Sequence, residues 1–152
     1  MRTEEERRIF SRPMLKVRKI IVLTHGKFAE GIVDSLRMIL GPQQHISPIC
    51  IHEDDAGADV QARLTENTKD LSDNDNIIII TDIVGGSSTN AALMFARTRD
   101  NTFVVAGLNL PLLIEIASSD DTDSSAVINE SIDVARESIV NLDYILKECS
   151  RS

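Results

Sequence analysis

The sequence predicts an α/β protein with three layers, α/β/α, around a mainly parallel sheet of four strands. Several short runs are apolar and mostly β-branched without polar alternation, which is typical of strands buried on both faces. Between them lie segments whose apolar residues recur every three or four positions, as in amphipathic helices. Strands that alternate with helices form parallel sheets with right-handed crossovers. The length of 152 residues suits one domain with one core.

The first half of the chain supplies two predicted strands and two predicted helices. The first strand covers residues 20–23 and passes through His25 into a helix over residues 28–40, which Gly41-Pro42 ends. The second strand covers residues 46–51, and a polar helix follows over about residues 58–71.

The second half repeats this alternation. Residues 77–80 form the clearest buried strand, which runs into the Gly-rich turn TDIVGGSSTN and a helix over residues 91–97. A fourth strand covers residues 102–106, and Asn109 is expected to cap a short helix. A long helix is predicted over residues 124–137.

The last segment, SIVNLDYILK, allows two interpretations. Its apolar residues alternate with mostly polar ones, which favours an antiparallel strand at the edge of the sheet. The alternative is that the segment continues the preceding helix.

Charge and composition exclude several functional classes. A formal net charge of -8 argues against binding to nucleic acid and to anionic membrane surfaces, since both would need basic patches. The longest apolar stretch, residues 103–117, is interrupted by polar residues and is shorter than the ~20 residues that span a bilayer. Cys50 and Cys149 do not suggest a disulfide framework, so we expect reduced thiols in a cytoplasmic protein.

The two ends of the chain differ in character. Residues 1–13 are charged and lack an apolar signal core, so we interpret them as a disordered extension or an added sequence, with Met14 as a candidate natural start. Residues 14–152 are expected to form a single domain.

A candidate site follows from topology. If the strand order is 2-1-3-4, the order reverses between the first and third strands, and open α/β sheets bind ligands at such a point. His25 follows the first strand and Asp82 follows the third, so we expect them to be neighbours. Asp82 could accept a hydrogen bond from Nδ1 of His25, which would leave Nε2 unprotonated and nucleophilic.

The segment GGSSTN beside this pair offers a place for an anion. Backbone N–H groups at a helix start bind phosphate, and Ser87, Ser88 and Thr89 are candidate caps or oxyanion donors. The segment matches neither a P-loop nor GxGxxG. Together, the histidine, the carboxylate and the anion site predict a centre that carries a phosphoryl group. We assign His45 and His52 structural roles and predict neither a metal nor a cofactor.

Three stretches in this order resemble the enzyme IIA domain of the phosphotransferase system, mannose/fructose/sorbose family: VLTHGKFAEGIVDSLRMILG, TDIVGGSSTNAA and VAGLNLPLLIEIA. The resemblance covers nearly everything from about Met14 onward. It implies phosphorylation of His25, an orienting role for Asp82, and Ser87 near the phosphoryl group.

Further residues belong to the predicted site. Besides Ser87, we expect Gly85, Gly86 and Thr24 to bind the phosphoryl group. The chain departs from the family in having Ser88 where proline is usual, and Val84 where an aromatic residue is often found.

The resemblance also implies partners. Phosphate would arrive from the histidine-containing phosphocarrier protein and leave for a separate IIB component, which serves the membrane IIC/IID permease. It further implies a homodimer in which the C-terminal strand is exchanged. The alternatives are a regulatory module, the IIA-like phosphoryl donor subunit of dihydroxyacetone kinase, and a plain ligand-binding domain.

Overall fold

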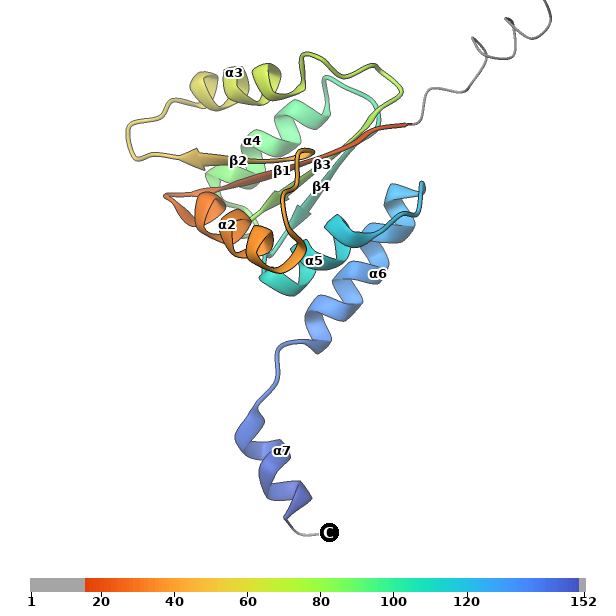
Figure 1. Cartoon of the computed structure of the whole chain (residues 1–152). Coiled ribbons are helices and arrows are strands. Elements are labelled where there is room, and N and C mark those ends of the chain that lie inside the picture. Colours follow the sequence, from red (N-terminus) through yellow and green to blue (C-terminus); the bar gives the residue numbers. More distant parts are fainter. Residues whose placement is uncertain (1–15, 151–152) are drawn as a thin grey trace, which may run out of the picture.

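The fold is centred on a four-stranded, all-parallel sheet (Figure 1). The computed structural model describes residues 16–150, so the extension predicted for residues 1–13 lies outside the described residues. The strand order β2-β1-β3-β4 confirms the predicted order. The strands are β1 (Arg18–His25), β2 (Ile46–Ile51), β3 (Asn76–Thr81) and β4 (Thr102–Ala106).

Helices cover both faces of the sheet and complete the predicted three layers. The helices are α2 (Phe28–Leu40), α3 (Gly57–Thr68), α4 (Ser87–Ala96), α5 (Leu110–Ser118), α6 (Ser124–Glu137) and α7 (Leu142–Cys149). Figure 1 shows α3 and α4 above the sheet and α2, α5 and α6 below it. Between residues 16 and 150, no helix is both long and apolar enough to cross a membrane.

The core is made of two apolar layers, one on each face of the sheet. Every residue of β3 is buried, because this strand lies between β1 and β4 and is covered on both faces. Ile78 and Ile80 pack toward α2 and α5, whereas Ile77 and Ile79 pack toward α3 and α4. Alternate side chains of one strand thus fix the helices on both sides.

One helix begins earlier than expected. The sequence predicts a helix over residues 91–97, but α4 begins at Ser87. Its first turn consists of hydroxyl and amide residues that lack an apolar repeat, so periodicity does not reveal it. The earlier start matters because it brings the helix N-terminus to the end of β3.

The prediction of an antiparallel edge strand at the C-terminus is wrong for this structure. Residues 142–149 form helix α7, which is separated from α6 and projects away from the sheet (Figure 1). Leu142, Ile145 and Leu146 also recur at helical spacing, and the Asn141 side chain accepts a hydrogen bond from the Tyr144 N–H at 3.4 Å. The cap and this second period favour a helix over a strand.

Helix α2 is anchored by a residue of the preceding strand. Its N-cap residue, Lys27, makes no side-chain capping bond. Instead the fully buried hydroxyl of Thr24 accepts a hydrogen bond from the Ala29 N–H at 2.7 Å. This contact satisfies one of the free N–H groups of the first turn and ties α2 to the end of β1.

We therefore expect Thr24→Val to destabilise the fold. Valine keeps the side-chain shape but leaves the buried Ala29 N–H without an acceptor, which costs about 1–3 kcal/mol in the free energy of unfolding. Urea denaturation measures the loss. The matched control is Thr65→Val, since Thr65 is exposed on α3 and its hydroxyl only donates to the Gln61 carbonyl of its own helix. Equal losses in the two variants would contradict the capping role.

Candidate functional site

The candidate site lies at the carboxyl ends of the two central strands. His25 is the last residue of β1, and Asp82 directly follows β3. The next strand along the chain, β2, pairs with one edge of β1, whereas β3 pairs with the other edge of β1. The strand order therefore reverses at this point, where open α/β sheets form a crevice.

The His25 ring is held by Asp82, as topology predicts. Oδ2 of Asp82 lies 2.8 Å from Nδ1 of His25 and also accepts a hydrogen bond from the His25 backbone N–H at 2.9 Å. An ionised carboxylate only accepts, so the arrangement favours a proton on Nδ1 and a free electron pair on Nε2. The His25 side chain is 44% exposed and that of Asp82 only 13%.

The other ring nitrogen faces Ser87. Its Oγ lies 2.8 Å from Nε2 of His25. With the proton on Nδ1, the Ser87 hydroxyl donates to Nε2. Ser87 is the first residue of α4, so the Nε2 edge of the ring meets the helix N-terminus.

Gly86 allows the close approach of ring and helix. A Cβ atom at this position would lie 3.1 Å from Cε1 of His25 and 3.0 Å from Ile83 side-chain atoms. Gly86 is also the N-cap residue of α4, where no side chain caps the helix. The first-turn N–H groups therefore remain available to an anion held beside the ring. Gly85, with φ of +78°, forms the preceding turn in a conformation that favours glycine.

Asp82 is held in its ionised form. Burial would raise its pKa, but hydrogen bonds from the Ser88 hydroxyl and from the backbone and ring of His25 outweigh burial and lower the pKa to about 2. The carboxylate is thus negative at neutral pH. It can stabilise a positive charge on the ring without giving up a proton of its own.

The remaining hydroxyl groups of this region point elsewhere. Ser88 donates to Asp82, and Thr89 contacts the Thr81 hydroxyl and the Ile83 carbonyl, so neither side chain is placed as an oxyanion donor. The Thr24 hydroxyl is buried against α2, which leaves Thr24 outside the site that we propose. The sequence patterns did not indicate these contacts, because they depend on side-chain direction.

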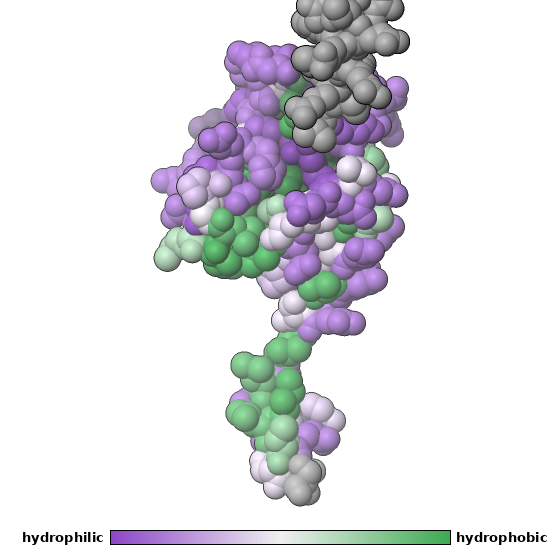
Figure 2. Space-filling view, turned by 45° about the vertical axis from the view of Figure 1, so that its right-hand side comes forward, coloured by the Kyte–Doolittle hydropathy of each residue, from purple (hydrophilic) through white to green (hydrophobic). Residues whose placement is uncertain are grey.

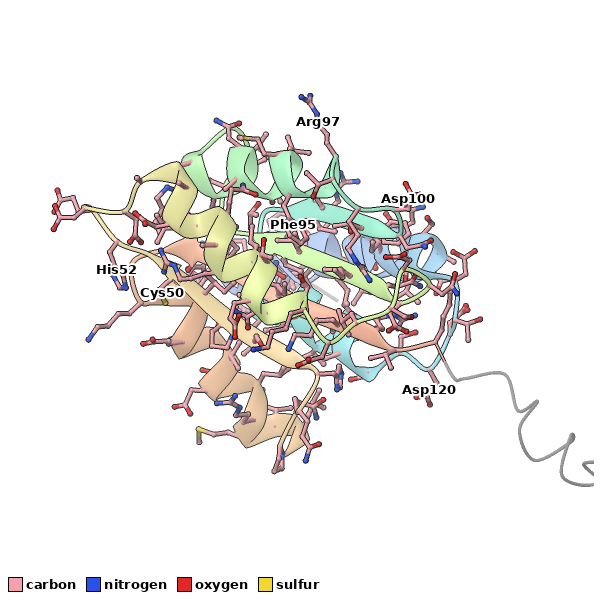
Figure 3. The ribbon with its side chains drawn as sticks, turned by 90° about the horizontal axis from the view of Figure 1, so that it is seen from above. Cys50, His52, Phe95, Arg97, Asp100 and Asp120 are labelled. Atoms are coloured by element: carbon pink, nitrogen blue, oxygen red, sulfur yellow. The ribbon has the colours of Figure 1, made fainter. Side chains whose placement is uncertain are left out.

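A cavity of about 610 Å³ adjoins the ring. It is lined by His25 and Ser87 and, from the β2 side, by His52, Glu53 and Val60. Figure 3 shows His52 at the opposite end of the molecule from Asp100 and Asp120. Because it lines this cavity together with His25, His52 borders the site. The structural role that we assigned to His52 from the sequence did not anticipate this position.

His45 has a different environment. It precedes β2 and so lies at the amino ends of the strands, away from His25. Burial, together with the nearby Lys19 and Arg18 charges, lowers its pKa. Within residues 16–150, no cluster of three or more His, Cys, Asp or Glu side chains could hold a metal ion.

Comparison with known proteins places the chain in a family. The model of a family described as "PTS system fructose IIA component" matches residues 19–133, more than half of the chain. The fructose-specific EIIA component of Bacillus subtilis is 27% identical over 99 residues, which are 65% of this chain and 68% of that protein. The mannose-specific EIIAB component of Escherichia coli K12 is 25% identical over 79% of this chain but only 38% of its own length.

Solved structures agree with the sequence comparisons. An EIIA component from Streptococcus agalactiae superposes with a TM-score of 0.77 at 27% identity, covering 84% of this chain and 99% of that one. The mannose/sorbose-specific IIA subunit from Enterococcus faecalis gives a TM-score of 0.76 at 26% identity, covering 82% and 94%. The chain therefore belongs to the mannose family of IIA components of the sugar phosphotransferase system.

Proposed function

We propose that the chain accepts a phosphoryl group on Nε2 of His25 and passes it on for sugar uptake. The observation that carries this proposal is the position of the ring, with Nδ1 on the Asp82 carboxylate and Nε2 facing the open N-terminus of α4. The donor is the histidine-containing phosphocarrier protein. The acceptor is a IIB component, through which the IIC/IID permease is served, and both exchanges occur in the cytoplasm.

The first transfer is a substitution at phosphorus. The electron pair of Nε2 forms a bond to the phosphorus atom, and the bond from phosphorus to the donor histidine breaks. The His25 ring becomes positively charged while its proton stays on Nδ1, and Asp82 supplies the opposite charge at 2.8 Å. Transfer to the IIB component reverses these changes.

Ser87 and the helix N-terminus receive the phosphoryl oxygens. In the unphosphorylated protein the Ser87 hydroxyl is bonded to Nε2, so it must turn away when the new bond forms. It can then donate to a phosphoryl oxygen, together with the free N–H groups behind Gly86.

Sugar transport is favoured over the related roles. The relatives above are named for fructose, mannose and sorbose systems, which supports the transport branch over a dihydroxyacetone kinase subunit or a purely regulatory module.

We also propose a homodimer that uses the C-terminal segment. Helix α7 has no buried residue, and its apolar side chains form the green surface that projects in Figure 2. The exposed fractions of Leu142 and Leu146 are 64% and 66%. An isolated helix of this length is unstable in water, so burial against a second copy would stabilise it.

His25 should be the sole phosphorylated residue, because among the histidines of the described chain only its ring is paired with a carboxylate, and its side chain is 44% exposed. The protein is incubated with phosphoenolpyruvate, enzyme I and the phosphocarrier protein, and the label is mapped by mass spectrometry under alkaline conditions. His25→Ala should remove the label and His45→Ala should keep it. A label on His45 or His52, or undiminished labelling of His25→Ala, would refute the assignment.

The low pKa of Asp82 should make part of the stability depend on pH. A carboxylate whose pKa falls from 3.8 to about 2 on folding stabilises the protein fully above pH ~4, and this contribution disappears as the pH falls toward 2. We expect the unfolding temperature of Asp82→Asn to fall less between pH 5 and pH 2.5 than that of the wild type. Parallel pH dependences in the two proteins would show that Asp82 is not ionised in this way.

Removal of residues 138–152 should give a monomer, since it deletes the apolar surface of α7. Light scattering measures the mass. The full-length double variant Leu142→Glu/Leu146→Glu tests the same surface without shortening the chain, and it should also be monomeric. An undiminished dimer in both proteins would place the interface elsewhere.

A further inference from the structure

The second oxygen of the Asp82 carboxylate is engaged as fully as the first. Oδ1 accepts a hydrogen bond from the Ser88 hydroxyl at 2.7 Å and from the Ile83 N–H at 3.1 Å. Oδ2, as described above, accepts both hydrogen bonds from His25. Four hydrogen bonds thus fix the carboxylate, and among these four donors only Ser88 contributes a side-chain hydroxyl.

Ser88 is placed for this contact by the start of α4. It is the second residue of the helix and is fully buried, with 0% exposure. Serine near a helix start commonly caps the helix, but no side chain makes a capping bond at Gly86. The hydroxyl instead points back to the end of β3.

We propose that Ser88 is a positioning residue for phosphoryl transfer: its hydroxyl holds the Asp82 carboxylate so that Oδ2 faces Nδ1 of His25 and keeps the proton there. This inference rests on the proposed function of His25. The Ser88 hydroxyl donates to Asp82 and not to the ring, so the side chain acts through Asp82.

Two further observations support this assignment. Burial would raise the pKa of Asp82, and among the hydrogen bonds that lower this pKa the one from Ser88 has the largest effect. The contact also departs from the family pattern, because the proline that the family resemblance leads us to expect at this position has no hydroxyl group.

Loss of the hydroxyl has a defined consequence. Without it, Oδ1 keeps only the Ile83 N–H, and the carboxylate can rotate about its terminal bond. Oδ2 would then hold Nδ1–H less firmly, and the neutral ring would more often carry its proton on Nε2. A ring protonated on Nε2 has no electron pair there to attack phosphorus, and its free pair on Nδ1 faces Asp82 instead of the donor, so transfer slows.

The test compares Ser88→Ala with Ser131→Ala. Both changes remove one buried serine hydroxyl from a helix, but Ser131 lies on α6, away from the site. Nitrogen-15 NMR of the unphosphorylated proteins, at a pH where the ring is neutral, gives the share of each His25 tautomer. Quenched-flow labelling from the phosphorylated phosphocarrier protein gives the transfer rate.

In Ser88→Ala we expect a larger share of the Nε2–H tautomer and transfer slowed about 3- to 10-fold, the effect of losing one hydrogen bond of ordinary strength. Ser131→Ala should match the wild type in both measurements. Asp82→Asn gives the reference for complete loss of the negative acceptor.

A wild-type tautomer balance in folded Ser88→Ala overturns the proposal, even if the unfolding temperature falls, because the role of Ser88 would then be structural only. A shifted balance with an unchanged transfer rate overturns the role in transfer. If the wild-type protein itself takes no label on His25, the proposed function fails, and the tautomer measurement still decides whether Ser88 positions Asp82.

Discussion

The carboxylate of Asp82 is the constraint on which the site depends. It links three elements of the fold: the last residue of β1, the turn after β3 and the first turn of α4. One oxygen holds both the backbone and the ring of His25, so the ring cannot turn without breaking a bond to a negative charge. Charge-assisted hydrogen bonds of this kind are about twice as strong as neutral ones.

The sheet makes this arrangement possible because it fixes the ends of β1 and β3 side by side. The two strands pair in parallel register from Arg18 with Asn76 to Leu23 with Thr81, and the isoleucines of β3 are buried on both faces. The residues that follow such a pair are held by the core rather than by their own loops. The histidine and its carboxylate therefore keep their distance even though the His25 side chain is 44% exposed.

The sequence predicted the framework well because its signals are local. Runs of β-branched residues predicted the strands. The predicted strand order placed the carboxyl ends of β1 and β3 side by side, so His25 and Asp82 were expected to be neighbours, and the structure shows that they are. The roles of Thr24 and Ser88 were missed for a different reason. Each side chain carries one hydroxyl group. Only the folded structure decides whether that hydroxyl faces an anion, a helix N–H group or a carboxylate.

The C-terminal segment shows where such patterns fail. Its apolar residues fit both a two-residue period and a three- to four-residue period, and eight residues are too few to separate them. Packing within the chain does not decide between the two periods either, because no residue of α7 is buried in the described structure.

Burial is divided unequally across the site, and this division suits a carrier of phosphoryl groups. The groups that set the charge and direction of the ring, Asp82 and Ser88, are largely shielded from water, where electrostatic interactions are stronger. Nε2 of His25, the proposed acceptor of the phosphoryl group, belongs to a side chain that is 44% exposed and lies beside the free end of α4. Phe28, Ile83 and Val84 expose their apolar side chains and follow His25 and Asp82 closely in the chain. They give a protein partner an apolar surface to bury near the proposed phosphoryl acceptor. A carrier needs both properties at once, since the same nitrogen must be reached by a donor and an acceptor while its charge is controlled from within the fold.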